Sequence, residues 1–179
     1  MSPNDDEQKC TTLRIRPATE HDARAISTLI RQNADVVLST HYSQQQLTAW
    51  KRYNTPARVR QRMQERSTFC AYRAGRLCAT IALQGTELVG FYVRPGARGQ
   101  GIGRALLAHL ETFAAANGIT ALHLRSTPSA LDFYSRCGWR AERAVVVSVM
   151  GVDFEDTFMT KRLHEGVAPT RAERSKTMR

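Results

Sequence analysis

The fold of this chain is decided by one stretch, Val93-Arg94-Pro95-Gly96-Ala97-Arg98-Gly99-Gln100-Gly101-Ile102-Gly103-Arg104-Ala105-Leu106-Leu107. It is typical of a strand end, a glycine-rich basic loop and the first turn of a helix. The N–H groups at a helix N-terminus are unpaired and carry partial positive charge, so they bind anions. Glycine lets the backbone approach the anion, and Arg98 and Arg104 add full charges. The sequence therefore predicts a phosphate-binding turn.

Two common nucleotide-binding motifs do not fit this turn. A P-loop requires Lys and then Ser or Thr after its last glycine, whereas Ile102 and Gly103 follow Gly101. The dinucleotide motif G-x-G-x-x-G would have Leu106 as its third glycine, and it lacks the acidic residue expected about 20 positions later. The pattern that does fit is Arg-x-x-Gly-x-Gly, at Arg98, Gly101 and Gly103.

Two further segments accompany this pattern in order. One is the strand-like run Glu87-Leu88-Val89-Gly90-Phe91-Tyr92-Val93 before the loop, and the other is Ala130-Leu131-Asp132-Phe133-Tyr134-Ser135-Arg136-Cys137-Gly138-Trp139 after it. Together they resemble motif A and the A-x-x-F-Y-x-x-x-G-F segment of the GNAT superfamily of acetyl-CoA-dependent N-acetyltransferases, with Trp139 in place of the final Phe. The resemblance implies transfer of an acetyl group from acetyl-CoA to a primary amine of a small molecule, peptide or protein. We expect direct attack in a ternary complex, because no cysteine or serine lies in the setting of a nucleophile.

Length and composition predict a single globular domain. The chain has 179 residues, of which 42% are hydrophobic. We expect this domain to span 11–163, with a flexible N-terminus at 1–10 and a disordered basic tail at 164–179. No apolar run is long enough to span a membrane, so we expect a cytoplasmic protein with no membrane partner. The four cysteines form no C-x-x-C motif, which favours reduced thiols and no metal site.

The net charge of +10 falls entirely on the predicted domain, because the charges of the two termini cancel. A basic surface can remain solvated, attract an anionic cofactor or bind nucleic acid. We do not expect nucleic acid as a partner, because no nucleic-acid motif is present. The alternative function is a catalytically idle CoA-binding module that binds nucleic acid or a protein through this surface. The positive charge also disfavours polycationic acceptors.

Periodicity and capping signals predict the secondary structure. We expect strands at 13–16, 68–73, 76–84, 86–93, 120–125, 145–150 and 158–163, and helices after Thr19, over 44–65 with a break at Asn54-Thr55-Pro56, over 101–117 and from Pro128 to Gly138, with 33–48 irregular. This order, β-α-α-β-β-β-α-β-α-β-β, predicts an α/β fold with a mixed central sheet and flanking helices, as the resemblance to GNAT proteins also implies.

The resemblance also implies the residues that bind acetyl-CoA. In the family, a bulge near the position of Val93 splays two strands, so that pantetheine adds beside the open strand and a backbone N–H binds the oxyanion. The implied cofactor-binding residues are Phe91, Tyr92, Val93, Arg98, Gly99, Gln100, Gly101, Ile102, Gly103, Arg104, Ser126 and Tyr134.

Two residues are candidate catalysts. Tyr134 is the candidate general acid, because a phenol with a pKa of ~10 is protonated at pH 7 and suits a thiolate leaving group; as an alternative, it is a core aromatic. Glu87 is the candidate base, at a position where histone-type members carry glutamate. Strand alternation would place it on one face with Phe91 and Val93, where burial would raise its pKa. As alternatives, Glu87 is an exposed charge after a turn, or water is the base.

The acceptor site is expected in the region formed by the first and second helical stretches. The resemblance places the wall of this site there, and the candidate substrate-binding residues are His41, Tyr42 and Trp50. As an alternative, Trp50 is part of the core. The sequence does not identify the acceptor, and we expect either a monomer or a homodimer.

Overall fold

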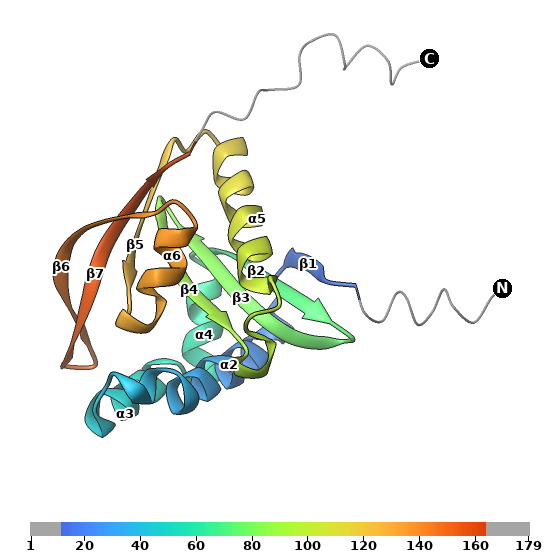
Figure 1. Cartoon of the computed structure of the whole chain (residues 1–179). Helices are drawn as coiled ribbons and strands as arrows, with labels where there is room; N and C mark the ends of the chain where they lie inside the picture. Colours follow the sequence, from blue (N-terminus) through green and yellow to red (C-terminus); the bar gives the residue numbers. More distant parts are fainter. Residues whose placement is uncertain (1–11, 164–179) are drawn as a thin grey trace, which may run out of the picture.

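A computed structural model describes residues 12–163 as one seven-stranded sheet flanked by helices (Figure 1). The strands are β1 (Arg14–Pro17), β2 (Ser67–Arg73), β3 (Arg76–Gln84), β4 (Glu87–Val93), β5 (Ala121–Ser126), β6 (Arg140–Val149) and β7 (Val152–Arg162). They lie in the order β1-β2-β3-β4-β5-β7-β6. All neighbouring pairs are antiparallel except β4 and β5, which are parallel. The mixed α/β sheet predicted from the sequence is therefore confirmed.

The helices of the described chain cover both faces of the sheet. They are α2 (Ala23–Val36), α3 (Gln44–Tyr53), α4 (Pro56–Met63), α5 (Ile102–Ala116) and α6 (Leu131–Arg136). Helices α5 and α6 pack on one face through a core that includes Leu106, Leu110 and Tyr134. Helices α2 and α4 cover the opposite face of the same strands through Leu29 and Val59. Helix α3 contacts the β6–β7 hairpin, as Figure 1 shows at the base of the molecule.

Capping residues explain where the helices of the second helical stretch begin. The Ser43 hydroxyl accepts a hydrogen bond from the Gln46 N–H, and the Gln46 side chain accepts one from the Ser43 N–H, which forms a capping box before α3. Thr55 caps α4, and Pro56 occupies the first helical position, where its missing N–H costs nothing. The predicted break at these residues is confirmed.

Two regions are more regular than the sequence indicated. Helix α2 continues to Val36, and within it the buried amide of Asn33 donates to the Leu29 carbonyl. The last two strands are longer than predicted, because β6 and β7 form one hairpin around Met150 and Gly151, whose φ angles are +55° and +76°. Cross-strand pairing thus extends beyond the short apolar runs from which these two strands were predicted.

A bulge interrupts β4 at its centre. Gly90 has a φ of +59°, a left-handed conformation that favours glycine. On either side of it the register with β3 shifts, so that two residues, Gly90 and Phe91, lie opposite the single residue Ile81. The structure therefore has the bulge that the resemblance implied, a few residues before Val93.

The bulge reverses the faces of the strand beyond it. Leu88, Phe91 and Val93 belong to the core beneath α5 and α6, whereas Tyr92 packs with α2 and α4. Glu87 precedes Leu88 and so lies on the other face from Leu88, Phe91 and Val93. The prediction that Glu87, Phe91 and Val93 share a face is wrong, because unbroken alternation does not survive the extra residue.

The parallel strands β4 and β5 are joined only at one end. Their ladder consists of the pair Glu87 and His123, and the His123 N–H also donates to the Thr86 carbonyl over 3.1 Å. Beyond this pair no ladder contact links the two strands within residues 12–163. The edge of β4 that follows the bulge therefore faces an opening in the middle of the sheet.

Other features of the described residues bear on the sequence predictions. Cys70, Cys78 and Cys137 are free thiols, and Cys10 lies outside the described part. None of the helices over residues 12–163 is long and apolar enough to cross a bilayer. The predicted flexible N-terminus at 1–10 and basic tail at 164–179 also lie outside the described residues.

Candidate active site

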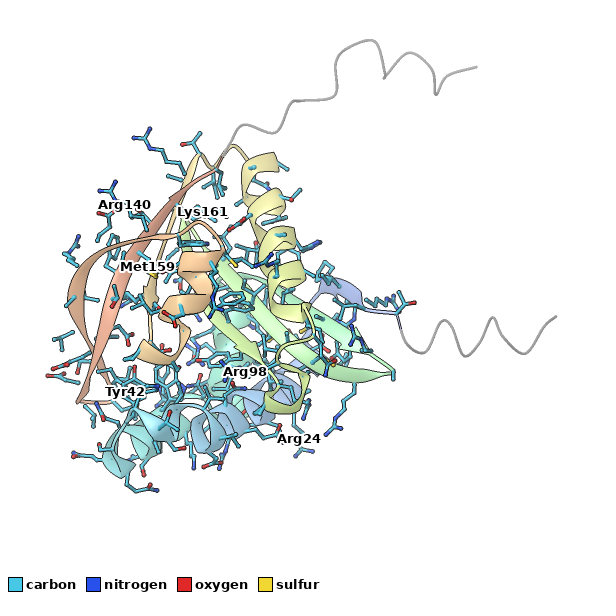
Figure 2. All side chains as sticks on the ribbon, in the orientation of Figure 1. Arg24, Tyr42, Arg98, Arg140, Met159 and Lys161 are labelled. Atoms are coloured by element: carbon cyan, nitrogen blue, oxygen red, sulfur yellow. The ribbon has the colours of Figure 1, made fainter. Side chains whose placement is uncertain are left out.

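A cavity of about 660 Å³ runs along β4 from the glycine loop to the β6–β7 hairpin. One end is formed by Arg98, Gly99 and residues 101–104, and the other by side chains of α3, α4 and β7. In Figure 2, Arg98 marks the loop end and Tyr42 lies beside the opposite end. The cavity therefore joins the predicted anion site to the predicted acceptor region.

The loop end has the geometry of an anion site. Gly99 and Gly101 have φ angles of +77° and +75°, which turn the backbone into the N-terminus of α5. The N–H groups in the first turn of a helix have no partner within the helix, so they are available to an anion at this point. Arg98 and Arg104 are exposed on the same wall of the cavity.

Gly103 allows α5 to begin directly against the sheet. A Cβ atom at this position would lie 3.2 Å from Cγ2 of Val93 and 3.6 Å from two ring carbons of Phe133. The glycine therefore serves close packing between α5, β4 and α6, in addition to the turn itself. All three of these residues line the cavity.

Two predicted cofactor residues do not line the cavity. Gln100 donates to the Gly96 carbonyl over 3.2 Å and accepts from Arg73 over 2.8 Å, so its side chain braces the loop. Ser126 is only 1% exposed, and its hydroxyl donates to the Thr127 carbonyl. Thr127, the next residue along, does line the cavity.

Tyr134 is both a core aromatic and part of the cavity wall. Its ring lies 5.4 Å from that of Phe133, 5.8 Å from that of Trp139 and 6.1 Å from that of Phe91, measured between centroids. Burial raises the pKa of the phenol above its ordinary value, with smaller contributions from Tyr92 and Cys137. The hydroxyl is therefore protonated at neutral pH.

Glu87 forms an ion pair with Arg125 across the β4–β5 pair. Nε and Nη2 of Arg125 both donate to Oε1 of Glu87, over 2.9 and 2.6 Å. The Glu87 side chain is 22% exposed and that of Arg125 is 44% exposed, and both residues line the cavity. Only Oε2 of Glu87 is outside this pair.

Asp156 on β7 is a cavity residue that the sequence analysis missed. The Tyr42 hydroxyl donates to its Oδ1 over 2.9 Å. Burial raises the pKa of Asp156, although the Tyr42 hydrogen bond and the Arg125 charge oppose the shift. Phe154, Asp156 and Phe158 are two positions apart and so share one face of β7. This spacing could have indicated an acid on an apolar face, but the predicted strand began only at Phe158.

The three predicted acceptor residues have different positions. Trp50 lines the cavity, and its ring lies 5.5 Å from that of Phe154. Tyr42 is buried, packs against Phe154 at 5.1 Å and reaches the cavity through Asp156. His41 is exposed and does not line it. Across residues 12–163 no group of three or more His, Cys, Asp or Glu side chains is placed to hold a metal ion.

Comparisons with known proteins agree with this architecture. A model of the GNAT acetyltransferase domain matches residues 38–163. Because this match covers most of the chain, the protein belongs to the GNAT acetyltransferase family, a class of acyltransferases. The family resemblance noted in the sequence is thus confirmed. A comparison with curated protein sequences finds no significant match.

Several solved structures are similar. A GCN5-related N-acetyltransferase from Rhodopseudomonas palustris has a TM-score of 0.81 and 26% identity, with coverage of 86% of this chain and 98% of that one. PaiA N-acetyltransferase from Thermoplasma acidophilum, in complex with coenzyme A, has a TM-score of 0.73 and 19% identity, and the match covers 85% of this chain and 99% of that one. A phosphinothricin acetyltransferase from Sinorhizobium meliloti, in complex with acetyl-CoA, has a TM-score of 0.68 and 21% identity, and the match covers 90% of this chain and 95% of that one. Because the last two structures are only 19% and 21% identical to this chain, their similarity shows a shared fold and no more.

Proposed function

We propose that this protein transfers an acetyl group from acetyl-CoA to a primary amine by direct attack in a ternary complex. The observation that carries this proposal is the single cavity that joins the N-terminus of α5 to Asp156 past Tyr134. Such a cavity can hold donor and acceptor at the same time, and their proximity lowers the barrier to transfer. Crystal structures of similar fold with coenzyme A or acetyl-CoA bound support the choice of donor.

In this proposal the donor binds at the loop end. The pyrophosphate accepts hydrogen bonds from the first turn of α5, with Arg98 and Arg104 nearby. The pantetheine arm lies beside the edge of β4 that β5 leaves unpaired. A backbone N–H near Val93, beyond the bulge at Gly90, donates to the thioester oxygen as it becomes an oxyanion.

The proposed reaction moves two protons. The amine nitrogen bonds to the thioester carbon, the C–S bond then breaks, and the CoA thiolate takes a proton from the Tyr134 hydroxyl. The amine attacks as neutral –NH2, and its nitrogen gives one proton to a base as the amide forms; Asp156 suits this role because burial raises its pKa toward a useful value. Asp156 then releases this proton to solvent, and the Tyr134 phenolate regains a proton from solvent. Glu87 is the second candidate base, but its Oε1 is already engaged by Arg125.

The alternative of an idle CoA-binding module gains no specific support from this site. The cavity brings together an anion turn, a protonated phenol and a carboxyl group, which is the set of groups that acyl transfer requires. A cytoplasmic location and a monomeric or homodimeric state remain predictions from the sequence.

The proposal is tested by incubating the protein with acetyl-CoA, labelled in the acetyl group, and a panel of primary amines. We expect one labelled N-acetyl product per CoA released, detected by mass spectrometry. CoA release without an N-acetyl product, or bound acetyl-CoA that no amine can discharge, would contradict the proposal.

Three variants test the assigned roles. Tyr134→Phe is expected to lower kcat by about 10²-fold or more while acetyl-CoA still binds. If Asp156 is the base, Asp156→Asn lowers kcat by a similar factor and removes the rise of activity with pH, whereas Glu87→Gln has the smaller effect. The reverse ranking would assign the base to Glu87.

A further inference from the structure

Three arginines on the α4 side of the cavity form no ion pair with any residue that the structure describes. Arg58, Arg62 and Arg66 are spaced by four residues, so they follow one face of the helix and its end, and all three line the cavity. Among the ion pairs of residues 12–163, none includes any of them. Like charges at this spacing repel one another, so an anion bound between them would be stabilising.

Arg62 is held in place as a donor. Its Nη1 donates to the Tyr53 carbonyl over 2.9 Å and its Nη2 to Oδ1 of Asn54 over 2.7 Å. Its guanidinium also lies 4.2 Å from the centroid of the Tyr53 ring. Burial lowers the pKa of Arg62, and the charge of Arg66 lowers it further. This guanidinium is therefore partly desolvated and pairs with no carboxylate among residues 12–163, so an anion bound nearby would favour its charged form.

Arg58 is the least engaged member of this row. Its side chain is exposed at the cavity rim, and no hydrogen bond of its guanidinium is found with another described residue. A guanidinium has five N–H donors and binds carboxylates in a bidentate manner. Arg58 can therefore close on an anion that Arg62 has oriented.

A carboxyl group shares the same space. Tyr92 is partly buried in the cavity wall, and its phenol lies within electrostatic range of both Arg62 and Asp156. The cavity thus presents fixed positive charge on the α4 side and Asp156, hydrogen-bonded by Tyr42, on the β7 side, while its other lining acid, Glu87, is paired with Arg125. A ligand that complements both sides carries an anionic group and an amine.

We propose that the acceptor is a small zwitterionic amine, such as an amino acid, whose anionic group binds Arg58 and Arg62 and whose amine points to Asp156. This inference rests on the proposed function, and it narrows the acceptor to one chemical class. The cavity volume of about 660 Å³ must also hold part of the donor, which favours a compact acceptor over a folded protein surface.

The test compares amines of matched length that differ only at the far end. We would titrate γ-aminobutyrate, butylamine and putrescine, and in parallel L-alanine and L-alaninamide, into the protein saturated with CoA and measure Kd by calorimetry. At least one zwitterion is expected to bind about tenfold or more tightly than its uncharged or dicationic counterpart. If neither zwitterion binds more tightly than its uncharged or dicationic counterparts, or if neither zwitterion binds at all, the proposal is overturned.

Variants of α4 locate the anionic group. Arg58→Gln is expected to raise the Kd of the zwitterion about tenfold, and Arg58→Lys is expected to restore part of the loss. Arg60→Gln is the matched control, because Arg60 is exposed on the same helix and does not line the cavity. If Arg58→Gln instead weakens CoA and leaves the zwitterion unchanged, the arginines serve the cofactor and the proposal is wrong.

These binding measurements do not depend on turnover. A zwitterion that binds through Arg58 but is never acetylated would contradict the proposed function and leave the binding site intact. An amine that is acetylated without such binding would support the proposed function and overturn the choice of acceptor.

Discussion

Gly103 lies where the first turn of α5 packs against β4 and α6, and we expect this position to tolerate alanine but not valine. An added Cβ would lie 3.2 Å from Cγ2 of Val93, which requires a shift of a few tenths of an ångström. Replacing a helical glycine with alanine gains about 0.5–1 kcal/mol, so Gly103→Ala should be close to neutral. Valine adds two further carbons, and overpacking of this kind costs about 1–3 kcal/mol.

The loss of stability in Gly103→Val is measured as the change in the free energy of unfolding in urea and as the shift in Tm. A cost of about 2 kcal/mol lowers Tm by about 4–8 °C in a protein of this size. Gly96→Val is the matched control in the same loop, because a Cβ at Gly96 would meet no atom within 4 Å. A Gly103→Val variant as stable as the parent, or equal losses at both glycines, would refute the packing argument.

Two carboxylates are expected to affect stability with opposite signs. The pKa of Asp22 lies well below its usual value, first because of the Arg16 hydrogen bonds and also because Tyr72 donates to it. The folded state therefore gains stability above the ordinary pKa of Asp and loses it as pH falls. Asp22→Asn should cost about 3 kcal/mol at pH 7 in urea unfolding and much less near pH 2, and a loss equal at both pH values would contradict this. Burial raises the pKa of Asp156, so its charged form weakens folding as pH rises. Asp156→Asn should therefore raise Tm at pH 8 and leave it nearly unchanged near pH 3, and a lower Tm at pH 8 would be inconsistent with burial as the cause.

Local signals in the sequence were sufficient to predict much of the fold. The glycine loop, the break at Asn54-Thr55-Pro56 and the strands before the loop each depend on neighbouring residues, and the structure confirms them. The turn at Gly101 could be predicted because its backbone geometry depends on glycine at that position.

The features that the sequence did not predict depend on contacts between distant residues. Asp156 and Tyr42 are 114 residues apart and meet only after β7 has packed beside α3. Glu87 was predicted as a candidate base, and its pairing with Arg125, which follows from the parallel β4–β5 register, was not predicted. The bulge at Gly90 reversed the faces of β4, and a single glycine within a strand does not reveal its φ angle.

The central claim is that the N-terminus of α5 binds the pyrophosphate of acetyl-CoA, and the comparison of Gly101→Asp with Gly101→Asn tests it most directly. No atom lies within 4 Å of a Cβ at this position, and both side chains must adopt the same φ of +75°, so the two variants differ mainly in charge. A carboxylate about 5 Å from one phosphate charge, at an effective dielectric constant of about 20, costs about 3 kcal/mol.

The measurement is the Kd of CoA and acetyl-CoA by calorimetry at low salt. We expect Gly101→Asp to bind both ligands about 100-fold or more weakly than Gly101→Asn. Equal affinity in the two variants, or no binding of CoA by the parent protein at millimolar concentration, would contradict the assignment of this site.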